Sequence, residues 1–165
     1  LVGSEMCIRD RLSSDWKNRG LDTNENLINL PYGVHGTDLA FSGLLTSAIS
    51  HSRELPLDQV CYSLQEHSFS SCIEVAERAM AHTGKRELLL GGGVACNARL
   101  REMSRIMCEE RGGEAFWPEK QYCIDNGTMI AELGRKELQS GRITKLSDSA
   151  IDPSMRTDSS IITWN

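Results

Sequence analysis

The chain has 165 residues, of which 39% are hydrophobic and 25% are charged, and its formal net charge is −5. This composition fits one globular domain, and no apolar run is long enough to span a bilayer, so we expect a cytoplasmic protein without a membrane partner. The acidic balance argues against a main nucleic-acid-binding surface in this chain, since neutralising phosphates requires clustered Lys and Arg.

Six cysteines are spread along the chain without any C-x-x-C pair. Zinc sites and redox motifs usually place two cysteines at that spacing, and disulfide frameworks are typical of small secreted proteins. Several of these cysteines fall within predicted helices, where a thiol packs as a small apolar group. We therefore expect free thiols at Cys7, Cys61, Cys72, Cys96, Cys108 and Cys123.

The chain begins with the segment LVGSEMCIRDRLSS, which shows no helical or strand periodicity. Its charged residues Glu5, Arg9 and Asp10 interrupt any apolar core, so we expect that this segment is not a secretory signal peptide. We predict that residues 1–28 form an irregular tail.

A long amphipathic helix is predicted from Leu57 to Thr83. Pro56 and Asp58 suit its first turn, and Gly84 is a residue type that often follows the last turn of a helix. Apolar residues recur along it at helical intervals, so one face should pack against a sheet. These residues are Val60, Leu64, Val75, Ala79 and Met80.

The next predicted unit is a strand, a glycine turn and a helix. Leu88–Leu90 form a short apolar run that ends in Gly91–Gly93. Helical spacing then extends from Asn97 to Arg111, and Gly112 closes it. In a parallel α/β sheet, ligands collect where strands end and helices begin, so this turn is a candidate site.

The glycine turn allows two interpretations. Glycine lacks a Cβ, so the backbone can approach a phosphate, ribose or base, while the next helix offers unpaired N–H groups. The pattern is neither the dinucleotide fingerprint nor the Walker P-loop, and a tight connection without a ligand explains it equally well. Asn97 is placed to reach a bound nucleotide, and its alternative role is to cap the helix.

Three arginines alternate with three glutamates on the predicted helix 97–111. We expect a solvated helix face with ion pairs four residues apart rather than a phosphate-binding cluster. The residues are Arg99, Arg101, Arg105, Glu102, Glu109 and Glu110.

A second strand, Glu114–Trp117, leads through Pro118 into a loop that carries Asp125, and another helix extends to about Ser140. The Asp125 carboxylate could bind a hard or borderline metal ion. For one carboxylate alone, helix capping or an Asn-Gly turn at Asn126 and Gly127 is the favoured interpretation.

Several separate blocks resemble the C-terminal half of the universal tRNA threonylcarbamoyladenosine synthase family, whose members were once called O-sialoglycoprotein endopeptidases. The resemblance covers roughly Asn29 to Trp164. The segments VCYSLQE, AHTGK and YCIDNG are similar to sequences of the archaeal and eukaryotic branch of the family, which supplies the catalytic subunit of the KEOPS complex. The main blocks are DLAFSGLLTSAI, GGGVACNARLREM, QYCIDNGTMIA and IDPSMRTD.

The resemblance implies an α/β fold of the actin, Hsp70 and sugar-kinase group, in which two ribonuclease-H-like lobes hold a nucleotide and a metal between them. Residues 29–165 would form the C-terminal lobe. The family's nucleotide-contacting asparagine matches Asn97, with Gly92 and Gly93 lining the pocket. The family's C-terminal metal ligand matches Asp125. No residue of this chain is assigned a directly catalytic role.

The activity implied by the resemblance is transfer of a threonylcarbamoyl group from threonylcarbamoyl-AMP to N6 of the adenosine next to the anticodon, in tRNAs that read ANN codons. The implied ligands are ATP or threonylcarbamoyl-AMP and one divalent metal ion, with iron as the family metal and zinc or magnesium as alternatives. The implied partners are tRNA and KEOPS-type subunits, namely a kinase-like subunit and a dimerising small subunit.

One part of the family pattern is absent from this sequence. Members carry an H-x-x-x-H pair and a metal-binding tyrosine in the first lobe, whereas the four histidines here are His35, His51, His67 and His82, with no pair at that spacing. A single carboxylate is a poor metal site. We therefore predict a lobe truncated at its N-terminal side, inactive by itself, and preceded by a foreign tail such as assembly read-through.

Two other functional classes remain open at this stage. One is a different enzyme of the same ATPase group, such as a carbamoyltransferase or a small-molecule kinase. The other is a non-catalytic scaffold paralogue that binds a partner through the long amphipathic helix. An upstream H-x-x-x-H motif would select the tRNA-modifying enzyme.

Overall fold

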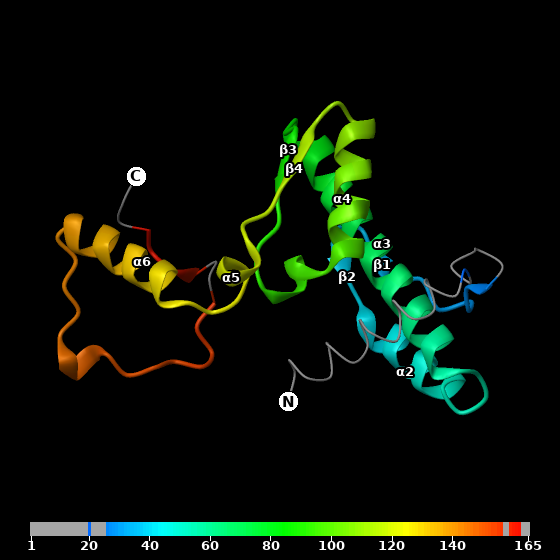
Figure 1. Cartoon of the computed structure of the whole chain (residues 1–165). Helices are drawn as coiled ribbons and strands as arrows, with labels where there is room; N and C mark the ends of the chain where they lie inside the picture. The colour runs from blue at the N-terminus through cyan, green and yellow to red at the C-terminus, as the bar shows by residue number, and fades with distance from the viewer. Residues whose placement is uncertain (1–19, 21–25, 157–158, 163–165) are drawn as a thin grey trace. The chain divides into compact units, whose positions relative to one another are not determined.

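The computed structural model describes residues 20, 26–156 and 159–162, and it divides the chain into two compact units (Figure 1). The first unit is Leu1–Pro118 and the second is Glu119–Asn165. Most of the predicted tail 1–28 lies outside the described residues, as does Cys7. No helix of the described ranges is both long enough and apolar enough to cross a membrane.

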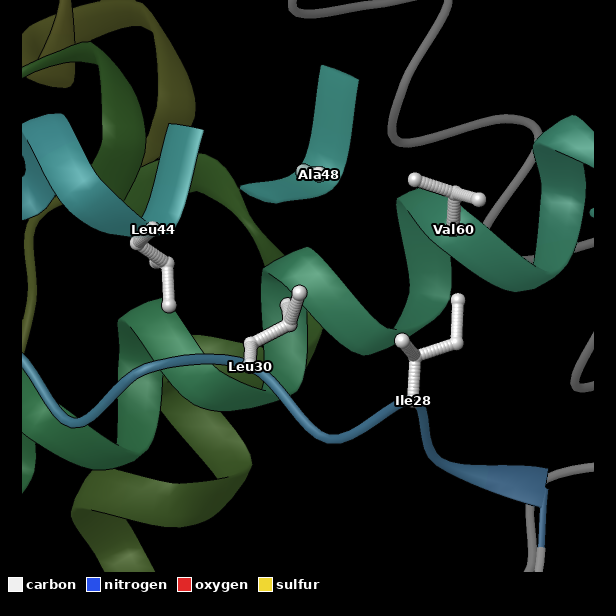
Figure 2. Packing of buried hydrophobic residues seen from close by; sticks show 5 residues of the cluster. All are labelled: Ile28, Leu30, Leu44, Ala48 and Val60. Atoms are coloured by element: carbon white, nitrogen blue, oxygen red, sulfur yellow. The ribbon is translucent and has the colours of Figure 1, made fainter. Parts of the chain in front are cut away.

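From residue 26 on, the first unit contains an extended segment and a short hairpin that pack on helices. Strands β1 (Val34–His35) and β2 (Asp38–Leu39) pair antiparallel, and helix α2 (Phe41–His51) follows and packs on α3 (Leu57–Thr83). Figure 2 shows the small core that joins these elements, in which side chains from the extended segment meet both helices. Its buried members are Ile28, Leu30, Leu44, Ala48 and Val60.

Helix α3 confirms the prediction at both ends. It ends at Gly84, whose φ of +66° is the left-handed conformation of a helix C-cap, and Lys85 N–H donates to the Met80 carbonyl at 3.1 Å. Val60 and Met80 are buried as predicted, but Ala79 is exposed. The prediction that Ala79 belongs to the packed face was wrong, because this long helix packs on α2 near its start and on other elements near its end.

A parallel strand pair forms the second part of this unit, as the sequence predicted. Strand β3 (Glu87–Leu89) pairs in parallel with β4 (Glu114–Phe116), with Leu88 opposite Ala115. The connection passes through a 3₁₀ turn, η2 (Gly93–Cys96), and helix α4 (Ala98–Glu110). These strand and helix limits lie within one residue of the predicted ones. Because helix α4 connects two parallel strands, the sheet is of the α/β type.

Helices α3 and α4 pack against one side of this sheet, where Leu88 and Ala115 are half-buried. Met80 of α3 meets Met107 and Cys108 of α4 in a second core, and the flanking side chains that pack against it are Ile73, Ala76, Leu88 and Ala115. Burial raises the pKa of the Cys108 and Cys72 thiols, so both favour the neutral form. The five cysteines of the described residues are free thiols, which confirms the prediction for those positions.

The second unit contains a short helix α5 (Lys120–Cys123), helix α6 (Gly127–Gln139) and the 3₁₀ turn η3 (Leu146–Asp148). Helix α6 ends within one residue of the predicted limit at Ser140. It is amphipathic, yet none of its residues is buried, and Ile130 and Leu133 are about half exposed or more.

Candidate functional site

The glycine turn connects β3 to the start of α4 and lies on the surface. Gly91, Gly92 and Gly93 are all exposed, and Gly92 has a φ of +83°, a conformation that side-chain-bearing residues rarely adopt. The chain then tightens into η2, in which Ala95 N–H donates to the Gly92 carbonyl at 3.0 Å and Asn97 N–H donates to Val94 at 2.9 Å. This turn brings Asn97 to the first position of the next helix.

Asn97 is the N-cap of α4, so the capping role considered from the sequence is confirmed. Its Oδ1 accepts hydrogen bonds from the N–H groups of Arg99 at 2.8 Å and Leu100 at 3.3 Å. Its Nδ2 donates to Oε1 of Gln65, on the neighbouring helix α3, at 3.1 Å. Contact with a nucleotide stays a prediction, and Gly92 and Gly93 stay predicted lining residues of that pocket.

The arginines of α4 are engaged by partners within the chain. Arg99 donates through Nε and Nη2 to both carboxylate oxygens of Glu66 at 2.8 Å each, and through Nη1 to Glu102 at 2.8 Å. Glu66 is buried, and the hydrogen bond with it raises the pKa of the Arg99 guanidinium. A bidentate pair of this kind is geometrically specific and strong for an ion pair.

The other two arginines of α4 also have partners within the chain. Arg101 places its guanidinium 5.4 Å from the centre of the Trp117 ring and donates to the Ala95 carbonyl at 2.5 Å. Arg105 pairs with Glu109 at 2.7 Å, one helical turn away. The predicted solvated face with ion pairs four residues apart is therefore confirmed for Arg105. Arg99 differs from the prediction, because it pairs with the buried Glu66 of α3 and with Glu102 three residues away.

An open pocket of about 370 Å³ lies beside the Glu66–Arg99 ion pair in the first unit. The segment before β1, the middle of α3 and the start of α4 line it, and Glu66 and Arg99 are among the lining residues. None of the predicted site residues Gly92, Gly93 and Asn97 lines this pocket. Sequence reasoning missed the Glu66–Arg99 contact, because 33 residues separate its two partners and no local pattern signals their pairing.

Asp125 belongs to the second unit and is exposed in the loop between α5 and α6. The cap of α6 is its neighbour Asn126, whose Oδ1 accepts from Met129 N–H at 3.0 Å while its Nδ2 donates to the Ile124 carbonyl at 2.9 Å. Asp125 is therefore not the N-cap of α6.

A complete metal site is not formed by the part of the chain that the structure describes. Within those residues, no group of three or more His, Cys, Asp and Glu side chains could hold a metal ion. Two of the histidines are turned to their own helices, with Nδ1 of His67 at 2.8 Å from the Ser63 carbonyl and Nδ1 of His51 at 2.9 Å from the Ser47 carbonyl. A resident metal thus does not fit these residues alone, and Asp125 offers at most one ligand.

A family model described as tRNA N6-adenosine threonylcarbamoyltransferase, TsaD, matches residues 9–132. The chain belongs to this family. The match includes the glycine turn, Asn97 and Asp125, and it confirms the resemblance found in the sequence motifs. It begins at residue 9, before the first block of resemblance near Asn29, and the predicted boundary between a tail and a lobe stays a prediction.

Similar curated proteins support the assignment. The chain is 53% identical over 137 residues to the "Probable bifunctional tRNA threonylcarbamoyladenosine biosynthesis protein" of Methanosarcina barkeri, covering 83% of this chain and 25% of that protein. It is 48% and 46% identical to proteins named "tRNA N6-adenosine threonylcarbamoyltransferase" from Methanococcoides burtonii and Xenopus laevis, covering 84% and 85% of this chain and 42% and 44% of theirs. The chain thus spans 25% to 44% of the length of these relatives.

One solved structure, that of HypF from T. kodakarensis, resembles the chain with a TM-score of 0.58 and 20% sequence identity. The likeness covers 82% of this chain and 17% of HypF. At this identity it is a likeness of fold, and it agrees with the α/β assignment.

Proposed function

We propose that the protein containing this chain transfers a threonylcarbamoyl group from threonylcarbamoyl-AMP to N6 of the adenosine next to the anticodon in tRNAs that read ANN codons. The chain would supply one wall of the site that holds ATP or the adenylate. Its fold would be a lobe of the actin, Hsp70 and sugar-kinase group. Family membership supports this proposal, and the strand, glycine turn and helix of residues 87–110 are the structural observation that carries it.

The glycine turn suits the adenylate for a physical reason. Its three exposed glycines leave the backbone uncovered at the end of β3, and the cap of α4, Asn97, follows four residues after Gly93. A phosphate group can lie against glycine backbone more closely than against any residue with a Cβ, and the start of a helix favours negative charge. Gly92, Gly93 and Asn97 would therefore bind and orient the nucleotide.

Asp125 is proposed as one carboxylate ligand of a divalent metal ion, for which iron is our first choice and zinc or magnesium are alternatives. When bound, such an ion would supply electrophilic stabilisation to an acyl or phosphoryl oxygen. Support for this role comes from its match to the family motif and from its exposure in a loop where the capping role is taken by Asn126. The other ligands would come from outside the described residues.

The proposed partners are tRNA and KEOPS-type subunits, namely a kinase-like subunit and a dimerising small subunit. The arginines of α4 are paired or stacked within this chain, and its formal charge is −5. Most phosphate contacts with tRNA would therefore come from other parts of the assembly.

The test is mass spectrometry of digested tRNA after reaction with the full-length protein. Asn97→Ser keeps a good helix cap but shortens the side chain, and Asp125→Ala removes an exposed carboxylate at little cost to folding. Both variants are expected to lose most of the modified nucleoside while keeping the thermal unfolding temperature of the parent. Undiminished product from Asn97→Ser would remove Asn97 from the nucleotide site, and undiminished product from Asp125→Ala would remove Asp125 from the metal site.

A further inference from the structure

We propose that Gln65 of α3 is a positioning residue for the nucleotide site, and that it acts by fixing the side-chain amide of Asn97. This inference rests on the proposed function, because it assumes that Asn97 contacts the adenylate. Its basis is the 3.1 Å hydrogen bond from Asn97 Nδ2 to Gln65 Oε1, which joins two helices at the end of the glycine turn.

The Asn97 amide is held from two sides in a single orientation. Its oxygen must face the first N–H groups of α4, where it accepts from Arg99 and Leu100, and its nitrogen then faces the Gln65 oxygen. A flipped amide would direct N–H groups at the N–H groups of the helix and its oxygen at the Gln65 oxygen. The contact with the helix N–H groups would then be repulsive, so the cap determines which end of the Asn97 amide faces α3, and the Gln65 oxygen is the acceptor for that end.

A second contact between the same two helices keeps this geometry in place. Glu66, the residue after Gln65, is buried and forms the bidentate pair with Arg99, two residues after Asn97. Consecutive residues of α3 thus hold the start of α4 through one neutral and one charged contact. Because the charged pair anchors the helices, loss of the Gln65 oxygen should remove this acceptor from Nδ2 of Asn97 without separating α3 from α4, while Oδ1 of Asn97 still caps α4.

The expected consequence is on binding rather than on the chemical step. A ligand-contacting amide that is already oriented loses less freedom when the nucleotide binds. Removing one neutral hydrogen bond is expected to weaken nucleotide binding by about threefold to tenfold. If Asn97 holds the adenylate equally before and during reaction, KM rises by this factor and kcat is unchanged.

The experiment compares Gln65→Met with Gln59→Met in the full-length protein. Gln59 is a matched control, since it lies on the same helix and donates a tertiary hydrogen bond of 2.9 Å to the Asn26 carbonyl, near the other core. The measurements are the dissociation constant for ATP by calorimetry and the KM and kcat for threonylcarbamoyl-AMP. Gln65→Ala is a second variant in case the methionine disturbs packing, and thermal unfolding checks that each protein is folded.

A double-mutant cycle tests the route through Asn97. Gln65→Met is expected to weaken ATP binding by about threefold to tenfold in the parent and to have no further effect in an Asn97→Ser background. An ATP affinity equal to that of Gln59→Met, or an effect that persists without Asn97, would overturn the positioning role. If Asn97→Ser alone leaves ATP affinity unchanged, the proposed nucleotide site fails instead, so the two failures are distinguishable.

Discussion

Gly113 lies where β4 begins beside β3, and its replacement by alanine is the sharpest test of this strand pair. A Cβ at this position would lie 2.2 Å from the Arg86 carbonyl oxygen and 3.0 Å from the carbonyl carbon. Carbon and oxygen atoms in close contact are ordinarily about 3.3 Å apart, so the start of β4 must move by about 1 Å. Both obstructing atoms are backbone, and no side-chain rotation relieves the clash.

The magnitude follows from what this movement breaks. Glu114 N–H donates to the same Arg86 carbonyl at 2.8 Å, and its loss costs about 1 kcal/mol. Overpacking adds about 1–3 kcal/mol. We therefore expect Gly113→Ala to lower the free energy of unfolding by about 2–4 kcal/mol, a large share of the roughly 5–15 kcal/mol of a typical domain.

Gly112→Ala provides the matched control at the adjacent position. Gly112 has a φ of +66°, and an added Cβ would meet no atom within 4 Å. Only backbone strain of about 1–2 kcal/mol is expected there. Both variants of the 165-residue chain should be compared by urea unfolding, followed by circular dichroism. If Gly113→Ala is no less stable than Gly112→Ala, the steric argument and the close approach of β4 to Arg86 are refuted.

Four further predictions concern other parts of the molecule. Glu66→Ala should lower the unfolding temperature, since it removes a charge-assisted contact worth about 1.5–3 kcal/mol; an unchanged temperature would contradict a stabilising pair. Gly134→Ala should stabilise α6 by up to about 1 kcal/mol in denaturant unfolding, because nothing lies within 4 Å of the added Cβ. The hydrogen bond from Arg135 lowers the pKa of the Glu132 carboxyl below its ordinary value of 4.5. The stabilisation from this pair is therefore fully present above pH 4.5 and is lost as the pH falls through the lowered pKa. In an NMR titration, a Glu132 midpoint that is the same in Arg135→Ala as in the parent would disprove this effect of Arg135. The 165-residue chain alone should bind ATP more weakly than micromolar in calorimetry, because its glycine turn is exposed.

Local patterns were sufficient for the elements that local interactions define. Helix α3 begins and ends at the predicted residues, because its limits depend on Pro56 and Gly84, which act within one turn. The free thiols of the described cysteines and the ion pair of Arg105 with Glu109 also follow from spacing alone. Family membership could be predicted from short motifs around the glycine turn and Asp125.

Contacts between distant residues were decided only by the tertiary structure. Gln65 and Glu66 are separated by more than 30 residues from Asn97 and Arg99, and no periodicity pairs a glutamine with an asparagine across that distance. The exposure of Ala79 has the same origin, since the buried side of a long helix depends on which elements lie beside it. Sequence thus determined where the elements and the candidate residues lie, while packing of α3 against α4 decided how the amide of Asn97 is held.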